Sequence, residues 1–336
     1  MTHIGVVGIS SITCPLSVRE ELTVNLEKRF FGLEESSSSF SFVLLSTCER
    51  VELYFSSHAP DQKAKMIIEW LLDKNPRAQE DYFYCFFNEN VWLHLAKVTA
   101  GLESALLGET EIQGQVKKAY RTFHEKNRLN VSLHLLFQKT LKITKEFRTH
   151  QLHQNKILSL ESVIFSKIKE IYLSENTLRI LFVGCSKTNQ SLIHAFRRKG
   201  FENLHLATSL SKEYAKQQIP CVEHHSRKIL GSTLSYDVVI CATKEFGFIP
   251  LFESDPSKKL IFDLSLPRTI DPELINTTQV CLYNIEHIGA LYRQKQELHL
   301  AGFYNDKNEL EEKVLKAYQR SLIKIDKERS HALCLA

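Results

Sequence analysis

The chain has 336 residues, of which 43% are hydrophobic and 24% are charged. This composition is typical of a folded globular protein and excludes a disordered or fibrous chain. Since the length exceeds the size at which one hydrophobic core usually stops growing, we expect two or three domains. The formal net charge of +4 permits contact with a polyanion but excludes a histone-like protein, and basic runs are short, such as the pair Lys117–Lys118.

Eight cysteines are scattered along the chain, without a Cys-x-x-Cys pair or a His–Cys spacing typical of a zinc site. This usage predicts a reducing compartment and no metal site. The first residues lack a basic segment followed by an apolar core, and no apolar run is long enough to span a bilayer. We therefore expect a cytoplasmic protein without a membrane partner.

The first part of the chain predicts a small sheet covered by helices. Apolar alternation indicates a strand over residues 3–9, and the helical spacing of Val18, Leu22 and Leu26 indicates a helix over residues 17–30. After an expected serine loop at 36–39, strands are predicted over 40–45 and 51–55, a helix over 63–72 and an aromatic strand over 79–87. From residue 90 to about 171 the apolar spacing predicts helices, interrupted near 127–130.

A parallel nucleotide-binding sheet is predicted after residue 178. An apolar strand over residues 179–184 ends at a glycine, a helix follows to about Lys199, and a second strand covers residues 204–207. Further strands are expected over 237–241, 260–264 and 280–283, and one long charged helix over 285–325. The predicted fold class is α/β and multidomain: an N-terminal α/β domain with a helical half, a Rossmann-like domain and a long C-terminal helix.

Cys48 lies in the run Ser46-Thr47-Cys48-Glu49-Arg50, on the tight connection between two predicted strands. A cysteine on such a turn is partly exposed, and a nearby arginine lowers the pKa of a thiol because positive charge favours the thiolate. Cys48 is therefore a candidate nucleophile. The alternative is that it packs as a small hydrophobic residue, as most single cysteines do.

The run Gly184-Cys185-Ser186-Lys187-Thr188-Asn189 stands where a dinucleotide fingerprint belongs, after a strand and before a helix. It keeps only the first of three glycines, although the second normally lets the backbone approach the pyrophosphate. Two interpretations stay open. The run is either a cofactor-binding turn with changed residues or part of a Rossmann-like fold whose cofactor site is poor or absent.

Three further residues are candidates for chemistry. His94 can act as an acid, a base or an orienting group, because imidazole titrates near neutrality. Glu109 and Glu111 follow Gly108 closely and can either bind an amine or be solvated.

Five stretches carry a common pattern along nearly the whole chain. They are Val7 to Glu20, Leu45 to Tyr54, His94 to Tyr120, Asp263 to Pro272 and Leu282 to Glu286. In this order and at these separations they resemble the glutamyl-tRNA reductase family, whose members start tetrapyrrole synthesis from glutamate.

The resemblance implies a domain division and a reaction. A catalytic glutamyl-recognition domain would cover residues 1–155, a Rossmann-like NADPH-binding domain 156–285, and a long helix with a remnant of a dimerisation domain 286–336. Cys48 would attack the ester carbonyl of glutamyl-tRNA(Glu) and release the tRNA. NADPH would then reduce the thioester to glutamate-1-semialdehyde, in the first step of porphyrin and haem synthesis.

The same resemblance implies residue roles. Besides Cys48 as the nucleophile, His94 would orient or polarise the reacting carbonyl, and Arg50 would grip the carboxylate of the substrate side chain with two donors. The other substrate-binding positions are Thr47, Ser104, Glu109, Glu111 and Gln115, and the cofactor-binding positions are Gly184, Cys185, Ser186, Lys187, Thr188, Asn189, Thr208 and Ser209.

The chain departs from the family pattern at the nucleotide turn and after the next strand, where the family's Asn-Arg-Thr reads Thr208-Ser209-Leu210. We expect Lys187 or Lys212 to meet the 2'-phosphate of NADPH instead. The expected partners are glutamyl-tRNA(Glu) and, for transfer of the product, glutamate-1-semialdehyde aminomutase. With only a remnant of the dimerisation domain expected, a homodimer stays open.

Two other functions stay open. A catalytically retired relative would bind glutamyl-tRNA or the aminomutase without reducing a substrate, which the altered nucleotide turn favours. Another thioester-forming semialdehyde dehydrogenase would act on a small phosphorylated or CoA-linked substrate, but no phosphate-gripping motif stands beside Cys48.

Overall fold

The computed structural model describes residues 3–31, 41–104, 111–125, 129–154, 159–172, 177–220, 222–226, 236–243, 259–273, 280–296 and 301–334. The expected serine loop at 36–39 and Glu109 lie outside these ranges, as do residues 127 and 128 of the expected interruption near 127–130. The chain divides into two compact units. The first comprises Met1–Ile157 with Lys295–Ala336, and the second comprises Leu158–Gln294.

A four-stranded antiparallel sheet forms the centre of the first unit, in the order β2-β3-β1-β4. Its strands are β1 (His3–Ser10), β2 (Phe42–Ser46), β3 (Arg50–Ser57) and β4 (Tyr84–Phe87). Helix α1 (Leu16–Phe31) connects β1 to β2, and helix α2 (Pro60–Lys74) connects β3 to β4. This order and these connections are those of the ferredoxin-like arrangement of split β-α-β units.

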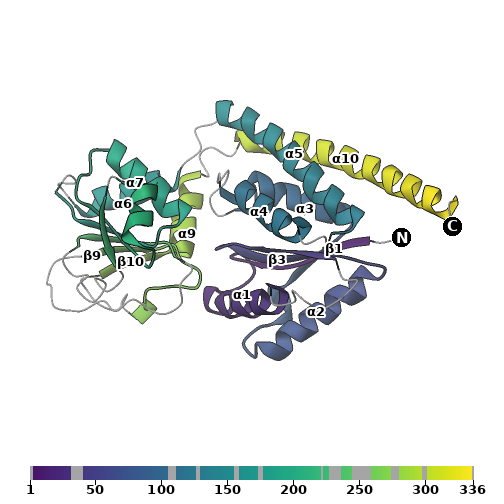
Figure 1. Ribbon diagram of the computed structural model, residues 1–336, viewed down its shortest axis with the longest axis horizontal. Coiled ribbons are helices and arrows are strands. Elements are labelled where there is room, and N and C mark those ends of the chain that lie inside the picture. The colour runs from purple at the N-terminus through teal and green to yellow at the C-terminus, as the bar shows by residue number, and fades with distance from the viewer. Residues whose placement is uncertain are drawn as a thin grey trace. The chain divides into compact units, whose positions relative to one another are not determined.

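Helices cover both faces of this sheet (Figure 1), so its central strands β1 and β3 are buried along almost their whole length. Helices α1 and α2 pack on one face, and α3 (Glu89–Ala100), α4 (Glu111–Glu125) and α5 (Val131–Gln154) pack on the other. Helix α10 (Ala301–Cys334) runs along α3 and α5 and adds Leu310 and Val314 to their core. Residues near the C-terminal end of the chain are thus part of the hydrophobic core of the first unit.

The second unit contains a six-stranded parallel sheet in the order β10-β9-β8-β5-β6-β7. Its strands are β5 (Ile180–Val183), β6 (Leu204–Thr208), β7 (Glu223–Ser226), β8 (Val238–Cys241), β9 (Lys259–Asp263) and β10 (Val280–Asn284). Numbered from β5 as the first strand, the order is 3-2-1-4-5-6, the strand order of the Rossmann fold. Every residue of β5, β8 and β9 is buried, as expected for parallel strands covered on both faces.

The helices of the second unit are α6 (Leu160–Ile171), α7 (Lys187–Arg198), α8 (Lys212–Gln218) and α9 (Ile285–Gln296). Aromatic packing joins two of them to the sheet. The ring of Phe196 on α7 lies 4.6 Å from the ring of Phe165 on α6 and 5.6 Å from that of Phe182 on β5, measured between centroids.

The predicted α/β fold class and its parallel nucleotide-binding sheet are confirmed. The aromatic strand begins later than predicted, at Tyr84, because a 3-10 turn (Glu80–Tyr82) precedes it. The single helix expected over 285–325 is wrong, since α9 and α10 cover the described part of this stretch and belong to different units. Strand β7 was missed because its sequence, Glu-His-His-Ser, has no apolar alternation. Helix α8 was missed because its short and mostly polar sequence shows no helical spacing of apolar residues.

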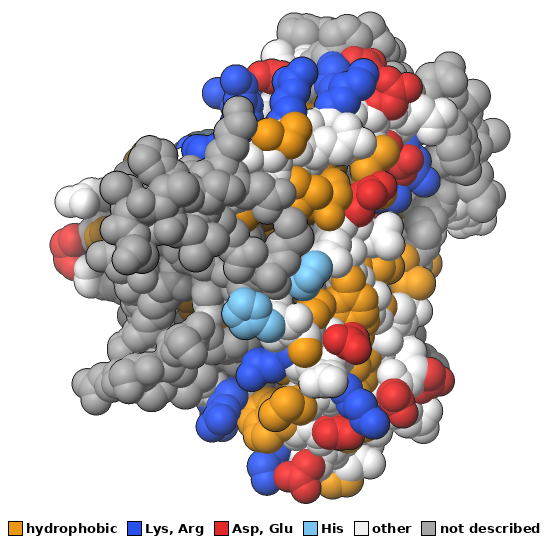
Figure 2. All heavy atoms as spheres, turned by 90° about the vertical axis from the view of Figure 1, so that its right-hand side faces the viewer, with side chains coloured by type: hydrophobic (Ala, Val, Ile, Leu, Met, Phe, Trp, Pro, Cys, Tyr) orange, Lys and Arg blue, Asp and Glu red, His pale blue; other side chains and the backbone are white. Residues whose placement is uncertain are grey.

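On the face drawn in Figure 2, Lys and Arg side chains stand in small groups with Asp and Glu side chains near them, and apolar patches lie between. Among the described residues of this face there is no continuous basic surface, in agreement with the low net charge. None of the described helices is long and apolar enough to cross a membrane.

Candidate active site

Cys48 lies on the connection between β2 and β3, where its side chain is half-buried. The backbone N–H of Thr47 donates to the carbonyl of Arg50 at 2.9 Å. The Thr47 hydroxyl oxygen accepts from the backbone N–H groups of Glu49, at 3.2 Å, and Arg50, at 3.1 Å. Thr47 therefore fixes the conformation of the turn that presents Cys48.

A buried carboxylate, Glu52, is the centre of the polar network behind this turn. Its side chain is fully buried and accepts hydrogen bonds from the hydroxyls of Tyr54 and Tyr84, each at 2.6 Å. It also receives Nη1 of Arg50 at 3.0 Å and Nε2 of His94 at 2.9 Å. Burial raises the pKa of Glu52, but the charges of His94 and Arg50 together with the hydrogen bonds outweigh it and hold the carboxyl well below its usual range.

Glu103 is a second carboxylate that contacts both cations of the network. Its Oε2 lies 2.9 Å from Nδ1 of His94 and 3.6 Å from Nη1 of Arg50, and its backbone carbonyl accepts from Nη2 of Arg50. Burial lowers the pKa of His94, but Glu52 and Glu103 outweigh this effect and raise it to about 9. At neutral pH His94 is therefore an imidazolium whose two N–H groups point at two carboxylates.

The sheet register explains how Tyr84 reaches Glu52 from a strand that is not adjacent to β3. Gly8 on β1 is paired with Glu52 on one side and with Tyr84 on the other. A Cβ built on Gly8 would lie 2.6 Å from the Tyr84 ring. Gly8 therefore lets the tyrosine ring cross β1, which is a close approach that requires glycine.

The substrate-binding positions predicted from the sequence are only partly brought together. Contacts through Glu52 and Glu103 join Arg50 to His94, while Thr47 is bonded to the turn backbone. Ser104 is buried directly after Glu103. Glu111 and Gln115 are half-buried on α4, and Glu109 lies outside the described residues.

Arg50 is also engaged differently from the role that the resemblance implies. Its side chain is 3% exposed, and both of its terminal nitrogens are bonded within the chain. Its Nε is buried without a hydrogen-bond partner among the described atoms. One donor of the guanidinium is thus left for another oxygen.

Sequence reasoning missed Glu52 and Glu103 as site residues. A signal for Glu52 was present, because Arg50, Glu52 and Tyr54 alternate with apolar residues along one strand and therefore share one face. Three polar side chains on one face of a strand predict either an exposed surface or a buried network, and only the covering helices distinguish the two.

The nucleotide turn of the second unit lies at the carboxyl end of β5, beside β8, where the strand order reverses. Gly184 has a φ of +91°, and a Cβ there would lie 2.7 Å from the carbonyl oxygen of Ala242. Only glycine fits this position. The retained glycine therefore stands at the switch point of the strand order, where open α/β sheets bind their ligands.

Two residues of this turn that stand in place of fingerprint glycines form hydrogen bonds to the backbone. Ser186 is the N-cap of α7, and its hydroxyl oxygen accepts from the backbone N–H of Asn189 at 3.2 Å. The Asn189 side chain is buried and donates from Nδ2 to the carbonyls of Val183, at 2.9 Å, and Gly184, at 2.7 Å. Asn189 thus fills the space where the fingerprint has its third glycine.

The other cofactor positions surround this turn. Lys187 is exposed in the first turn of α7, and Cys185 is half-buried with its carbonyl accepting from Gln190 at 3.2 Å. Thr188 is half-buried beside them, while Thr208 is buried and Ser209 exposed at the carboxyl end of β6. The side chain of Lys212 lies outside the described residues. A helix N-terminus with a lysine and a glycine-dependent close approach fits an anionic dinucleotide.

Comparisons with known proteins agree with both units. The model of the glutamyl-tRNA reductase N-terminal domain matches residues 7–151, and the shikimate/quinate 5-dehydrogenase model matches residues 166–291. The second unit is thus a dehydrogenase-type nucleotide-binding domain.

Full-length relatives cover most of the chain. A curated glutamyl-tRNA reductase from Chlamydia abortus is 32% identical over 307 residues, which are 88% of this chain and 86% of that protein. One from Wigglesworthia glossinidia brevipalpis is 28% identical over 87% of this chain and 74% of its own length. The solved structure of glutamyl-tRNA reductase from Methanopyrus kandleri is similar in fold over 97% of this chain and 82% of that one, with a TM-score of 0.50 at 22% identity. The chain belongs to the glutamyl-tRNA reductase family.

Proposed function

We propose that this chain reduces glutamyl-tRNA(Glu) to glutamate-1-semialdehyde with NADPH, through a thioester on Cys48, as the first step of porphyrin and haem synthesis from glutamate. The observation that carries the proposal is the half-buried thiol of Cys48, presented on a turn that Thr47 fixes, in a chain of this family.

The first half of the reaction needs a nucleophile and a leaving group. The Cys48 thiolate attacks the ester carbonyl carbon, the bond from that carbon to the ribose oxygen breaks, and this oxygen takes up a proton to become the free hydroxyl of the tRNA. A thioester remains on the enzyme. Its carbonyl stays electrophilic, so a hydride can add to the carbon while the C–S bond breaks and the thiolate is restored.

Glu103 suggests how the glutamyl side chain is bound. Its side chain is 31% exposed, and its carboxylate contacts both His94 and Arg50, the two cations of the network. The substrate carries a carboxylate of the same chemistry. We infer that the substrate carboxylate displaces that of Glu103 and takes over its contacts, using Nδ1 of His94, Nη1 of Arg50 and the unpartnered Nε of Arg50.

In this proposal His94 binds and orients, and is not a base at neutral pH. Its raised pKa of about 9 keeps both ring nitrogens protonated. Glu52 holds Nε2 in place from the buried side. Nδ1, which faces the partly exposed Glu103, is therefore available as a charged donor once Glu103 has moved.

The second unit is proposed to bind NADPH, which supplies the hydride. Gly184 permits the close approach of the pyrophosphate, and the N-terminus of α7 favours its negative charge. Lys187 is the exposed cation at this helix end and is proposed to meet the 2'-phosphate that distinguishes NADPH from NADH. Thr208 and Ser209 end the neighbouring strand β6, where the adenosine ribose is expected.

A second candidate function is a retired relative that binds glutamyl-tRNA without reducing it. The observation that favours it is the nucleotide turn, in which Asn189 fills the place of a glycine and Ser186 caps an amide of α7. These contacts reduce the room and the donors left for a pyrophosphate.

A two-step assay distinguishes the candidates. Purified protein is first incubated with tRNA carrying a radiolabelled glutamyl group, without a nicotinamide cofactor, and the label bound to protein is measured before and after hydroxylamine, which cleaves thioesters. We expect hydroxylamine-sensitive label on the wild type. NADPH or NADH is then added, and we expect semialdehyde to form faster with NADPH.

The outcomes separate the two halves of the proposal. Label on the protein without semialdehyde would favour the retired relative. Absence of label together with tRNA binding would refute Cys48 as the nucleophile. Because the Glu103 carboxylate would compete with that of the substrate, a Glu103→Gln variant should have a lower KM for glutamyl-tRNA at unchanged kcat. An unchanged or raised KM would refute the displacement of Glu103.

A further inference from the structure

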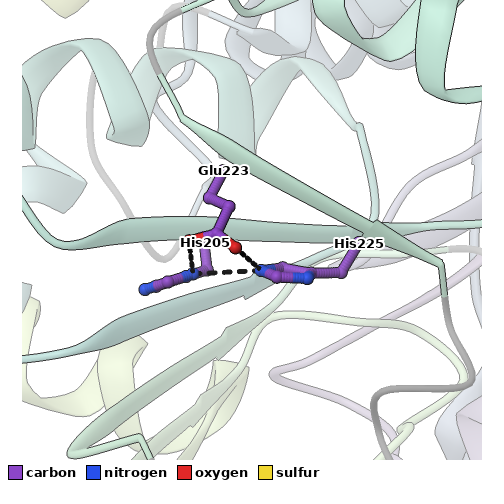
Figure 3. Close-up of side chains that lie close together, drawn as sticks. All are labelled: His205, Glu223 and His225. Atoms are coloured by element: carbon purple, nitrogen blue, oxygen red, sulfur yellow. Dashed lines mark hydrogen bonds and ion pairs between the residues drawn. The ribbon is translucent and has the colours of Figure 1, made fainter.

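A second cluster of chemically versatile side chains lies in the second unit. His205 projects from β6, and Glu223 and His225 project from β7, so that their polar ends converge (Figure 3). No metal site was expected from the sequence, because no ligand residues stand at the short spacings typical of zinc sites. Here the ligands are separated by 18 residues and are brought together by strand pairing.

The register of the two parallel strands produces this convergence. His205 is paired with Glu223, and Ala207 is paired with His225. Since side chains alternate along a strand, Glu223 and His225 lie on one face of β7, the face that His205 and Ala207 share on β6. The small side chain of Ala207 leaves room for His225 to lean toward His205.

Two of the three distances among the polar ends are those of a metal-binding triangle, and the third, between the two nitrogens, is slightly shorter. Nδ1 of His205 lies 3.0 Å from Nε2 of His225. The carboxylate of Glu223 places one oxygen 3.3 Å from the first nitrogen and the other 3.5 Å from the second. For zinc bonds of about 2.0–2.2 Å at tetrahedral angles, ligand atoms lie about 3.3–3.6 Å apart.

We propose that His205, Glu223 and His225 form a binding site for a divalent transition-metal ion of the zinc type. Two imidazoles and one carboxylate are a donor set that such ions prefer, and the 64% exposed Glu223 leaves the outer coordination positions to solvent. His205 and His225 are 12% and 19% exposed, so the ion would be held against the sheet. This site is independent of the proposed reductase activity.

The place of the site in the sheet indicates a structural role. Strand β7 is at the edge of the sheet and is short and polar. A metal ion that binds residues of β6 and β7 would join this edge strand to its neighbour. His205 precedes Thr208 by three residues, or about 10 Å along β6, so the ion would lie away from the carboxyl end at which the nucleotide is expected.

Metal binding by the full-length chain tests the proposal directly. Zn²⁺ is titrated into metal-free protein in competition with a chromophoric chelator, and Co²⁺ is used as a spectroscopic probe. We expect one ion per chain and visible Co²⁺ bands without a sulfur-to-metal charge-transfer band, since no cysteine is among the ligands. Glu223→Gln should weaken Zn²⁺ binding at least about tenfold, and His225→Gln and His205→Gln at least as much.

His194→Gln is the matched control, because His194 is an exposed histidine on α7 in the same unit. Its Zn²⁺ affinity should equal that of the wild type. Zn²⁺ should also raise the melting temperature of the wild type and of His194→Gln but not of Glu223→Gln, whose exposed side chain can be changed without disturbing the fold. The proposal is overturned if no stoichiometric ion binds, if Co²⁺ shows thiolate ligation, or if the three ligand variants bind as the wild type does.

Discussion

The two units treat the polar residues of their candidate sites in opposite ways. In the first unit, Glu52 gathers donors from Arg50, Tyr54, Tyr84 and His94, which come from two strands and a helix. In the second unit, Ser186 and Asn189 bond to backbone groups within a few residues of themselves. The first site is held by long-range side-chain contacts and the second by local ones.

This difference determines how each site responds to substitution. A network built from several elements loses all its geometry when its central group is removed, because the remaining charges are left buried without a partner. A turn held by local contacts loses only the contacts of the residue that is changed. If the two sites are separable in this way, a substitution in one unit leaves the site of the other unchanged.

Replacing the nucleophile should have the largest effect and should be confined to the first unit. Cys48→Ser is expected to lower the rate of thioester formation at least about 1,000-fold, because a hydroxyl without an activating base is a poor nucleophile. The dissociation constant for NADPH should stay unchanged. Protein-bound label and NADPH fluorescence titration measure the two quantities on the same samples.

Cys85→Ser is the matched control for this prediction. Cys85 is half-buried on β4 of the same sheet, and burial raises the pKa of its thiol, so it is unsuited to nucleophilic attack. Thioester formation should persist in this variant. Turnover retained in Cys48→Ser would disprove the assignment of the nucleophile.

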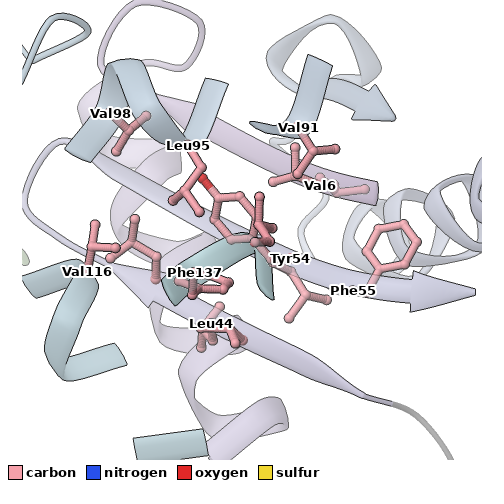
Figure 4. Packing of buried hydrophobic residues seen from close by; sticks show 14 of the residues in the cluster. Val6, Leu44, Tyr54, Phe55, Val91, Leu95, Val98, Val116 and Phe137 are labelled. Atoms are coloured by element: carbon pink, nitrogen blue, oxygen red, sulfur yellow. The ribbon is translucent and has the colours of Figure 1, made fainter. Parts of the chain in front are cut away.

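Removing the charge of Glu52 should cause the largest loss of stability. Its neighbour in the network, Tyr54, lies among Leu95 of α3 and Phe137 of α5 in the core (Figure 4), so the network is fixed by surrounding packing. Glu52→Gln leaves the buried Arg50 and His94 with only the partly exposed Glu103 as a shared anion and should lower the free energy of unfolding by about 3–5 kcal/mol.

Urea denaturation measures this loss, with Glu69→Gln as the control. Glu69 is exposed on α2 and pairs with an exposed lysine at 3.8 Å, so its loss should cost less than about 1 kcal/mol. Equal stability of the two variants would contradict the central role of Glu52.

The raised pKa of His94 predicts a pH dependence of stability. A group whose pKa is about 9 in the folded chain and 6.5 when unfolded stabilises the fold fully below pH 6.5, and its contribution is lost as the pH rises through 9. The free energy of unfolding should therefore fall across this window, by up to about 3 kcal/mol at about 1.4 kcal/mol per pK unit. Urea denaturation of the wild type and of His94→Gln across the window isolates the contribution, and parallel curves for the two proteins would contradict it.

The sequence predicted what depends on local pattern. Both sheets, most helices and the place of Cys48 on a turn follow from apolar spacing. Tertiary pairing decided the rest: Glu52 became a buried hub only because α3 and β4 bring His94 and Tyr84 to it, and Glu223 joined two histidines only through the register of β6 and β7. Local propensity also gave no reason to divide the segment after residue 285 between two units, since that division depends on what each helix packs against.

The smallest predicted effect is a change in cofactor affinity at the nucleotide turn of the second unit. Lys187 is exposed, so neutralising it in Lys187→Gln should raise the dissociation constant for NADPH only about two- to fivefold, as expected for an exposed ion pair. The dissociation constant for NADH, which lacks the 2'-phosphate, should not change, and neither should thioester formation on Cys48. Lys199→Gln, at the other end of α7, is the control. Equal weakening of NADPH and NADH would show that Lys187 contacts the shared pyrophosphate, because only a contact to the 2'-phosphate distinguishes the two cofactors.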